Sequence, residues 1–211
     1  MTELAERLER CPFVAILRGI APAEVDAVAD ALREEGFGIV EIPLNSPDPY
    51  ASIERLAGRL GGELLVGAGT VLDADSARRV ARAGGRLVVA PNADERVVRA
   101  ARDNGMYAMP AFATPTEAFR MIEAGAHALK LFPAEGSSPS VLAAMRAVLP
   151  RDMAVLPVGG IRPDVLGPWW KAGAAGFGLG SALYRAGDPA AQVAQRARAF
   201  MQALQALRAA S

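Results

Sequence analysis

The sequence predicts an α/β protein, a compact (β/α)8 barrel of the TIM-barrel type with an extra N-terminal helix, forming one domain over residues 1–211. Short apolar segments alternate with amphipathic helices along the whole chain, which is typical of parallel strands joined by helical crossovers. Eight such segments are present, and no Pro/Gly/Ser-rich linker divides them. A flavodoxin-like open sheet is the alternative, but that architecture uses fewer strands.

Glycine marks the points where predicted helices end and strands begin. Gly36 stands before one apolar run and Gly84-Gly85 before another, and glycine just after a helix is the expected stop signal. The predicted strands begin near Phe13, Gly38, Leu64, Leu87, Met106, His127, Ala154 and Gly176.

The helices carry their own signals. Residues 1–10 and 22–35 are amphipathic. Thr114-Pro115-Thr116-Glu117 has the spacing of a capping box with proline at the first helical position, which predicts a helix over 116–124. From Pro189 onward the pattern predicts one long terminal helix.

Composition argues against several classes of protein. Lys plus Arg and Asp plus Glu both number 23, so the formal net charge is zero and nothing indicates a nucleic-acid binder. The single cysteine, Cys11, excludes an internal disulfide and a cysteine metal cluster, and the single histidine, His127, argues against a histidine-based metal site or triad. The N-terminal helix lacks the apolar region of a secretory signal, and no apolar stretch is long enough to span a bilayer. We therefore expect a soluble cytoplasmic protein.

The chain has two lysines in different surroundings. Lys171 lies at the predicted end of a helix, where a cation is favourable. Lys130 lies inside the apolar run 126–133, which predicts a buried strand. A buried ammonium is costly without a partner, and a desolvated lysine loses its proton and becomes a nucleophile for carbonyl carbon. Lys130 is therefore either a nucleophile or a structural lysine paired with a buried carboxylate.

Side-chain alternation turns a glutamate toward the barrel interior. Successive side chains of a strand point to opposite faces, and one face of a barrel strand is the interior. In the second strand Val40, Ile42 and Leu44 suit the helix side, which leaves Glu41 inside. In the sixth strand Leu129 and positions 127 and 131 suit the helix side, which leaves Lys130 inside, together with positions 126, 128 and 132. His127 is thus predicted to be a packed or hydrogen-bonded residue beneath a helix.

Four ionisable or polar side chains gather toward the carboxyl ends of the strands, where barrel enzymes place their chemistry. These predicted site residues are Arg18, Glu41, Thr70 and Lys130. A compensating ion pair between Glu41 and Lys130 is the alternative, although barrel interiors are normally filled with branched apolar side chains. Glu63 and Arg86 stand at strand starts on the opposite rim, and we assign them to stability.

The last two strands end in glycine motifs. Gly159-Gly160 follows the seventh strand and Gly180-Ser181 the eighth. Glycines let backbone N–H groups approach an anion closely, and the loops after strands seven and eight are the recurrent phosphate site of this fold. The ligand is predicted to be a small phosphorylated molecule.

Taken together, these motifs resemble the Schiff-base aldolases that release pyruvate from 2-keto-3-deoxy-6-phospho sugar acids, the KDPG/KHG aldolase family. Within it, gluconate-type members usually carry Arg in the strand-two motif and Thr before the Gly-Gly pair. This chain has Asn45 and Val158 there, so it is closer to the galactonate type. The resemblance covers nearly the whole chain and rests on segments 15–19, 40–47, 66–71, 129–133, 158–160 and 178–181.

The resemblance implies a mechanism and partners. Lys130 would form the imine, Glu41 would move the protons, and Arg18 and Thr70 would bind substrate. Residues assigned to the phosphate are Gly159, Gly160, Gly180 and Ser181. The expected partners are the phosphorylated keto-acid sugar and pyruvate, with no metal or cofactor, in a cytoplasmic homotrimer that serves galactonate catabolism.

Three alternatives remain open at this point. They are a gluconate-type aldolase, a phosphosugar isomerase or epimerase that uses Glu41 and Lys130 as an acid–base pair, and a non-catalytic phosphate-ligand binder. The adjacent Trp169 and Trp170 could serve a subunit interface or ordinary helix packing.

Overall fold

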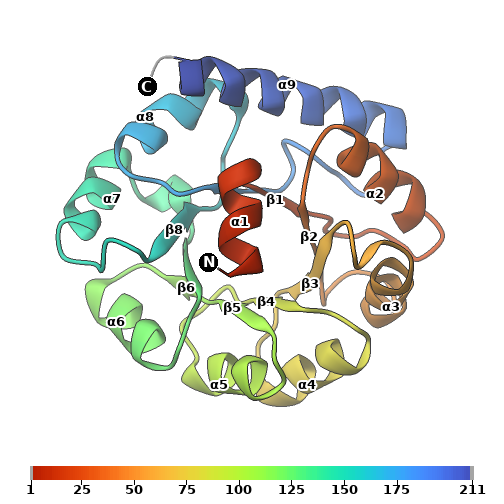
Figure 1. The fold of residues 1–211 in the computed structure, drawn as a ribbon, viewed down its shortest axis with the longest axis horizontal. Coiled ribbons are helices and arrows are strands. Elements are labelled where there is room, and N and C mark those ends of the chain that lie inside the picture. The colour runs from red at the N-terminus through yellow and green to blue at the C-terminus, as the bar shows by residue number, and fades with distance from the viewer. Residues whose placement is uncertain (1, 210–211) are drawn as a thin grey trace.

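The computed structural model describes residues 2–209 and arranges a ring of helices around parallel strands (Figure 1). The strands form a six-stranded sheet of order β5-β4-β3-β2-β1-β9 and a three-stranded sheet of order β6-β7-β8. The strands are β1 (Phe13–Ile16), β2 (Ile39–Pro43), β3 (Leu65–Gly69), β4 (Leu87–Val89), β5 (Tyr107–Met109), β6 (Ala111–Phe112), β7 (Ala128–Leu131), β8 (Ala154–Pro157) and β9 (Phe177–Leu179). The helices are α1 (Glu3–Arg10), α2 (Val25–Glu34), α3 (Pro49–Leu60), α4 (Ala74–Arg82), α5 (Glu95–Asp103), α6 (Pro115–Glu123), α7 (Pro139–Arg146), α8 (Leu166–Lys171) and α9 (Ala190–Ala209).

The predicted α/β fold with parallel strands is confirmed, and each predicted strand begins within one residue of its observed start. The structure has one strand that was not predicted, β6, which is separated from β5 by Pro110. Proline has no backbone N–H, so it interrupts the ladder at that position. The Pro110 carbonyl still accepts a 2.9 Å hydrogen bond from the N–H of Lys130, and Ala108 accepts one of 2.9 Å from His127. These bonds connect the six-stranded sheet to β7.

One helix signal in the sequence matches the observed terminus, and one predicted start does not. Thr114 caps α6 in a capping box with Glu117, as predicted. The predicted helix 22–35 is shorter than expected, because residues 22–24 form turns before α2 begins. Trp169 is buried and the Trp170 ring stacks on Phe177 with centroids 6.4 Å apart, so both tryptophans take part in internal packing.

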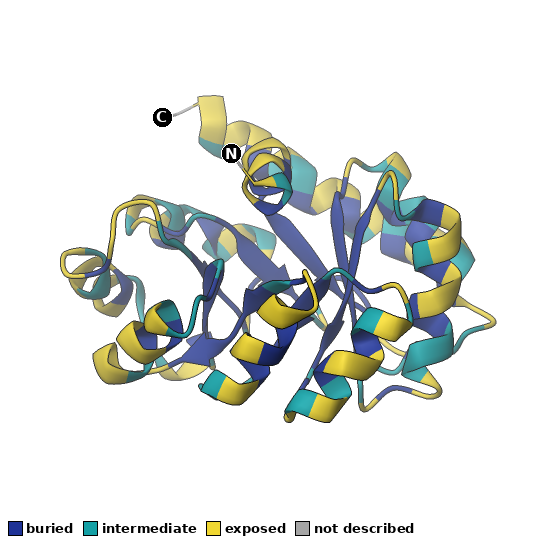
Figure 2. Ribbon diagram, turned by 60° about the horizontal axis from the view of Figure 1, so that its bottom comes forward, coloured by how far each residue is buried: buried dark blue, intermediate teal, exposed yellow. Residues whose placement is uncertain are grey.

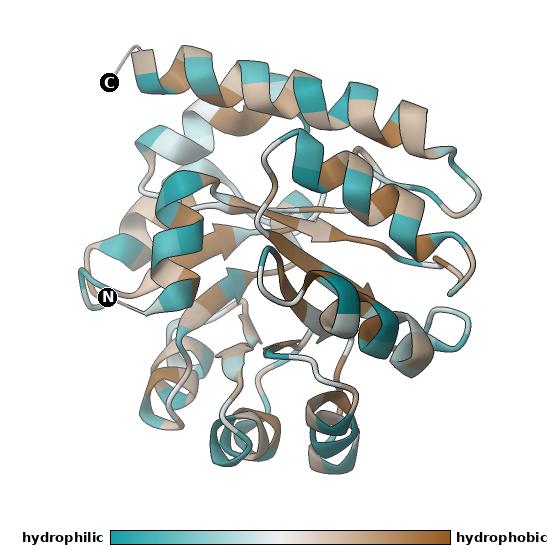
Figure 3. Ribbon diagram, turned by 45° about the vertical axis from the view of Figure 1, so that its right-hand side comes forward, coloured by the Kyte–Doolittle hydropathy of each residue, from teal (hydrophilic) through white to brown (hydrophobic). Residues whose placement is uncertain are grey.

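The strands are buried and the helices turn exposed residues outward (Figure 2), and hydrophobic residues are concentrated in the strands (Figure 3). The buried apolar residues form two clusters, one on each face of the strands. Val40, Ile42 and Leu129 belong to the cluster under the helices, and Ile39 and Ala128 belong to the cluster inside the ring. The alternation predicted for the second and sixth strands is therefore correct. Ala126 was placed inside by the same rule, and that placement was wrong: it packs under the helices, because β7 begins only at Ala128.

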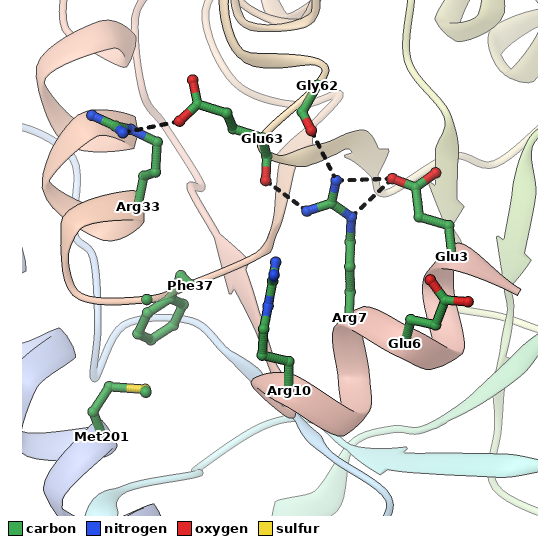
Figure 4. Close-up of a pocket in the computed structure, with 10 residues that line it drawn as sticks. Glu3, Glu6, Arg7, Arg10, Arg33, Phe37, Gly62, Glu63 and Met201 are labelled. Carbon is green, nitrogen blue, oxygen red and sulfur yellow. Dashed lines mark hydrogen bonds and ion pairs between the residues drawn. The ribbon is translucent and has the colours of Figure 1, made fainter. Parts of the chain in front are cut away.

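Helix α1 lies across one end of the ring (Figure 1). Its Leu4 and Leu8 join the interior cluster. Arg7 is buried and donates to the carbonyl oxygens of Gly38 at 3.3 Å and Glu63 at 2.6 Å, next to a cleft of about 730 Å³ (Figure 4). None of the predicted site residues lines this cleft.

The two residues assigned to stability join the strand starts to helices: Arg86 to α1 and Glu63 to α2. Arg86 donates to Glu3 at 2.7 and 3.0 Å, and Glu63 pairs with Arg33 at 3.0 Å. Within residues 2–209 no helix combines the length and apolar character needed to cross a membrane.

Candidate active site

Glu41 and Lys130 are both buried among the strands, with exposed fractions of 1% and 4%. Glu41 is the middle residue of β2, beside Ile16 of β1, and Lys130 is the third residue of β7. No ion pair or hydrogen bond joins the two side chains, and Glu41 Oε2 has no hydrogen-bond partner among the described residues. A compensating ion pair requires direct contact, so this geometry leaves both groups available for other chemistry.

Burial shifts both groups toward their neutral forms. Desolvation raises the pKa of Glu41 to about 7, although the charges of Lys130 and Arg18 oppose the rise. Desolvation also lowers the pKa of Lys130; Glu41 opposes this shift and Arg18 adds to it. The Phe132 ring lies 4.5 Å from Lys130 Nζ and favours the ammonium form, but the lost hydration of a buried amine is the larger effect.

Glycines in β3 make room for the buried carboxyl group. A Cβ atom on Gly69 would lie 1.6 Å from Glu41 Oε2, and one on Gly67 would lie 2.2 Å from the Leu87 carbonyl oxygen. Any side chain at Gly69 would therefore displace the Glu41 carboxyl. The Gly67-Ala68-Gly69 pattern of the third strand thus has a steric cause.

Arg18 and Thr70 meet at the carboxyl ends of β1 and β3. Arg18 lies in the turn that follows β1, and its Nη1 donates to Asn45 Oδ1 at 2.6 Å. Both terminal nitrogens also lie 3.4 Å from Thr70 Oγ1. Thr70 has a φ of 55°, in the left-handed region, which turns the chain out of the strand. These contacts hold the Arg18 guanidinium at the carboxyl ends of the strands.

A pocket of about 370 Å³ connects the amine to the glycine motifs. The predicted residues that line it are Arg18, Lys130, Gly159, Gly160, Gly180 and Ser181. Glu41 and Thr70 do not line it: Glu41 lies deeper in the interior, and Thr70 lines a separate pocket with Asn45. One continuous pocket thus joins a buried amine to the backbone of two glycine loops.

Sequence reasoning assigned no role to four further side chains of this pocket: Phe132, Glu135, Arg162 and Arg185. Arg185 donates from Nε to the Ser181 carbonyl at 3.1 Å, and Arg162 pairs with Asp164 at 3.1 Å. The available signal was their place in the chain, since each arginine follows a glycine motif within a few residues.

His127 lies outside this pocket, as predicted. Its Nδ1 accepts a 3.1 Å hydrogen bond from the Ala108 N–H, and its ring packs in a T-shaped arrangement with the Tyr107 ring, with centroids 5.0 Å apart. Partial burial and the charge of Arg102 lower the pKa of His127. No group of three or more His, Cys, Asp or Glu side chains suited to a metal ion occurs in residues 2–209.

The buried carboxyl predicts a pH-dependent stability. The pKa of Glu41 is about 7 in the folded chain and 4.5 in the unfolded chain, so between these pH values the folded state holds a proton that the unfolded state has released. The contribution of Glu41 to stability is therefore present below pH 4.5 and is lost as the pH rises to 7, by roughly 3 kcal/mol. Glu41→Gln should remove this loss, so its free energy of unfolding should exceed that of the unchanged protein at pH 8 by more than at pH 5. Urea denaturation at both pH values measures these free energies of unfolding. An equal difference between the two proteins at pH 5 and pH 8 would contradict the raised pKa of Glu41.

The family model for KDPG and KHG aldolase matches residues 4–196 of this chain. The chain is 48% identical over 194 residues to 2-dehydro-3-deoxy-6-phosphogalactonate aldolase of Escherichia coli (strain K12), covering 92% of this chain and 95% of that protein. The solved structure described as "Native KDPGal structure" aligns with a TM-score of 0.93 at 46% identity, over 95% of this chain and 97% of that one. A chain of a cube-shaped porous cage, designed by fusing symmetric oligomeric domains, aligns with a TM-score of 0.93 at 46% identity, over 95% of this chain and 74% of that one.

Proposed function

Because this chain belongs to the KDPG and KHG aldolase family, we propose that it cleaves 2-dehydro-3-deoxy-6-phosphogalactonate to pyruvate and D-glyceraldehyde 3-phosphate through a Schiff base at Lys130. The observation that carries the proposal is the buried Lys130 amine, unpaired with Glu41 and opening into a pocket that reaches the glycine motifs. A phosphosugar isomerase needs no amine nucleophile, and a non-catalytic binder has no use for two buried, shifted groups.

The chemistry begins at the neutral amine. Lys130 Nζ attacks the C2 ketone, and the carbinolamine loses water to give a protonated imine. The imine accepts the electron pair of the C3–C4 bond as that bond breaks. The C4 hydroxyl loses its proton and becomes the aldehyde of D-glyceraldehyde 3-phosphate, and the lysine retains the enamine of pyruvate. Protonation at C3 and hydrolysis then release pyruvate, so the proposed reaction requires neither metal nor cofactor.

Glu41 is the proposed proton carrier of these steps. A carboxyl with a pKa of about 7 is present in both forms near neutral pH, which suits a group that takes and returns protons. It takes the C4 hydroxyl proton during cleavage and returns one to the enamine. Its lack of any hydrogen-bond partner in the described structure leaves Oε2 free for this exchange.

The remaining predicted residues are proposed to hold the two ends of the substrate. Arg18 donates to the carboxylate of the pyruvyl end, and Thr70 supports that guanidinium. The phosphate is proposed to bind the backbone N–H groups at Gly159, Gly160 and Gly180 and the Ser181 hydroxyl. The pocket that contains Arg18, Lys130 and these glycines supports this assignment.

We further propose that the two sheets act as one closed (β/α)8 barrel in a single domain. The bonds from β7 to the β5–β6 segment support closure on one side, and the bridge between Val158 and Gly178 supports it on the other. We also propose a homotrimer, for which the related chain in a cage of symmetric oligomeric domains supports an oligomer of some kind. The cytoplasmic location stays a prediction.

The two epimeric substrates test this function. Pyruvate release should be faster by about tenfold or more in kcat/KM from the galactonate compound than from the gluconate compound, the size expected for one well-placed hydroxyl contact. Val158, at the position where gluconate-type members usually have Thr, lines the pocket, so Val158→Thr should narrow the ratio. A preference for the gluconate compound would support the gluconate-type alternative. No pyruvate from either compound would remove the aldolase proposal.

A further inference from the structure

Glu135 is the one acidic side chain among the residues that line the pocket, and the proposed mechanism does not use it. The other charged side chains there are Arg18, Lys130, Arg162 and Arg185. Glu135 lies in a short 3-10 turn, Ala134–Gly136, directly after Pro133. This turn is fixed to the segment just before Gly159-Gly160, because the Ala134 N–H donates to the Val158 carbonyl at 2.9 Å.

The Glu135 carboxylate lies against the Gly159-Gly160 backbone. A Cβ atom on Gly159 would lie 2.0 Å from Glu135 Oε2, and one on Gly160 would lie 2.8 Å from Glu135 Cγ. Both glycines also have positive φ, 110° and 63°. The carboxylate therefore occupies space that only the absence of side chains at these two positions leaves open.

This carboxylate is not neutralised by its neighbours. Among residues 2–209, the Glu135 side chain takes part in no hydrogen bond and no ion pair, and it is exposed to solvent. The two nearby arginines are engaged elsewhere, Arg162 with Asp164 and Arg185 through Nε with the Ser181 carbonyl. A negative charge thus stands at the glycine pair with no bonded counter-charge.

We propose that Glu135 competes with the phosphate of the ligand for the space over Gly159 and Gly160 and so limits the affinity of the pocket for phosphorylated molecules. The inference rests on the proposed function, which puts the phosphate at these glycines. A phosphate that enters must displace the carboxylate or remain beside it. Two negative charges that lie side by side repel each other. Glu135 thereby speeds release of the phosphorylated product, because that product carries the same group.

The test uses Glu135→Gln, which removes the charge and keeps the shape, with Glu135→Asp as the matched variant that keeps the charge. The probe is glycerol 3-phosphate, an unreactive relative of the product, measured as an inhibitor of cleavage. Its inhibition constant should fall roughly tenfold in Glu135→Gln, as the loss of one nearby like charge predicts, and should stay near the original value in Glu135→Asp. The ratio of the inhibition constants of the unaltered protein and Glu135→Gln should be larger at pH 8 than at pH 5.5, because the phosphate gains its second negative charge near pH 6.

An unchanged or higher inhibition constant in Glu135→Gln would overturn the proposal, and a higher one would make Glu135 an acceptor that assists binding. Thermal melting checks that both variants are folded. Trapping of pyruvate on the unaltered protein with borohydride tests the proposed function separately from the role of Glu135, because pyruvate carries no phosphate. Failure to trap removes the proposed function, whereas trapping with an unchanged inhibition constant removes the role of Glu135 alone.

Discussion

Lys130→Met is expected to lower cleavage by more than about 10⁴-fold, the scale seen when a covalent nucleophile is removed. Methionine keeps most of the length and apolar stem of lysine, so the buried site in β7 stays filled while the amine is lost. Without the amine no imine forms, and the electron pair of the C3–C4 bond has no acceptor. Incubation of the unaltered protein with pyruvate and borohydride should give a stable adduct that mass spectrometry locates at Lys130.

The chain supplies its own control for this experiment, since Lys171 is its other lysine. Lys171 ends α8 and is exposed, so nothing desolvates its amine. Lys171→Met should leave the pyruvate adduct and the cleavage rate as they were. An adduct found at Lys171, or full cleavage activity in Lys130→Met, would refute the assigned role of Lys130.

The strands and the interior position of Glu41 and Lys130 follow from local patterns. Apolar runs bounded by glycine predict the strand positions closely, because short buried strands leave little freedom in where they begin. The inward direction of the two ionisable side chains follows from alternation, since a shift by one residue would put Val40 or Leu129 among the interior groups. These are short-range effects that one sequence contains in full.

The contacts made by loops do not follow from such patterns. The division of β5 from β6 at Pro110 depends on the neighbouring backbone, where the Lys130 N–H bonds the Pro110 carbonyl. The start of α2 depends on the turns at residues 22–24. Glu135 reaches Gly159 only because the backbone of its turn is bonded to Val158. Contacts between segments far apart in the chain are set by the packed fold, so sequence reasoning found the glycines and missed the side chain over them.

Glu41→Gln is expected to lower kcat/KM by about 10²- to 10⁴-fold, the usual contribution of a positioned acid–base group. Glutamine keeps the shape beside Gly69 but cannot exchange a proton. Lys130 remains, so pyruvate should still be trapped, although more slowly, because the carbinolamine must then lose water without assistance. The two variants thus separate covalent chemistry from proton transfer.

The pH profile gives the sharper result for Glu41. A base must be ionised to accept the C4 hydroxyl proton, so kcat/KM of the unaltered protein should rise with pH through the Glu41 pKa of about 7. The inflection near pH 7 should disappear in Glu41→Gln, because no carboxyl then titrates there. Glu63→Gln, which alters a glutamate on the opposite rim, should keep it. If the rise persists in Glu41→Gln at full rate, another group moves the proton and the buried carboxyl has only an electrostatic effect on Lys130.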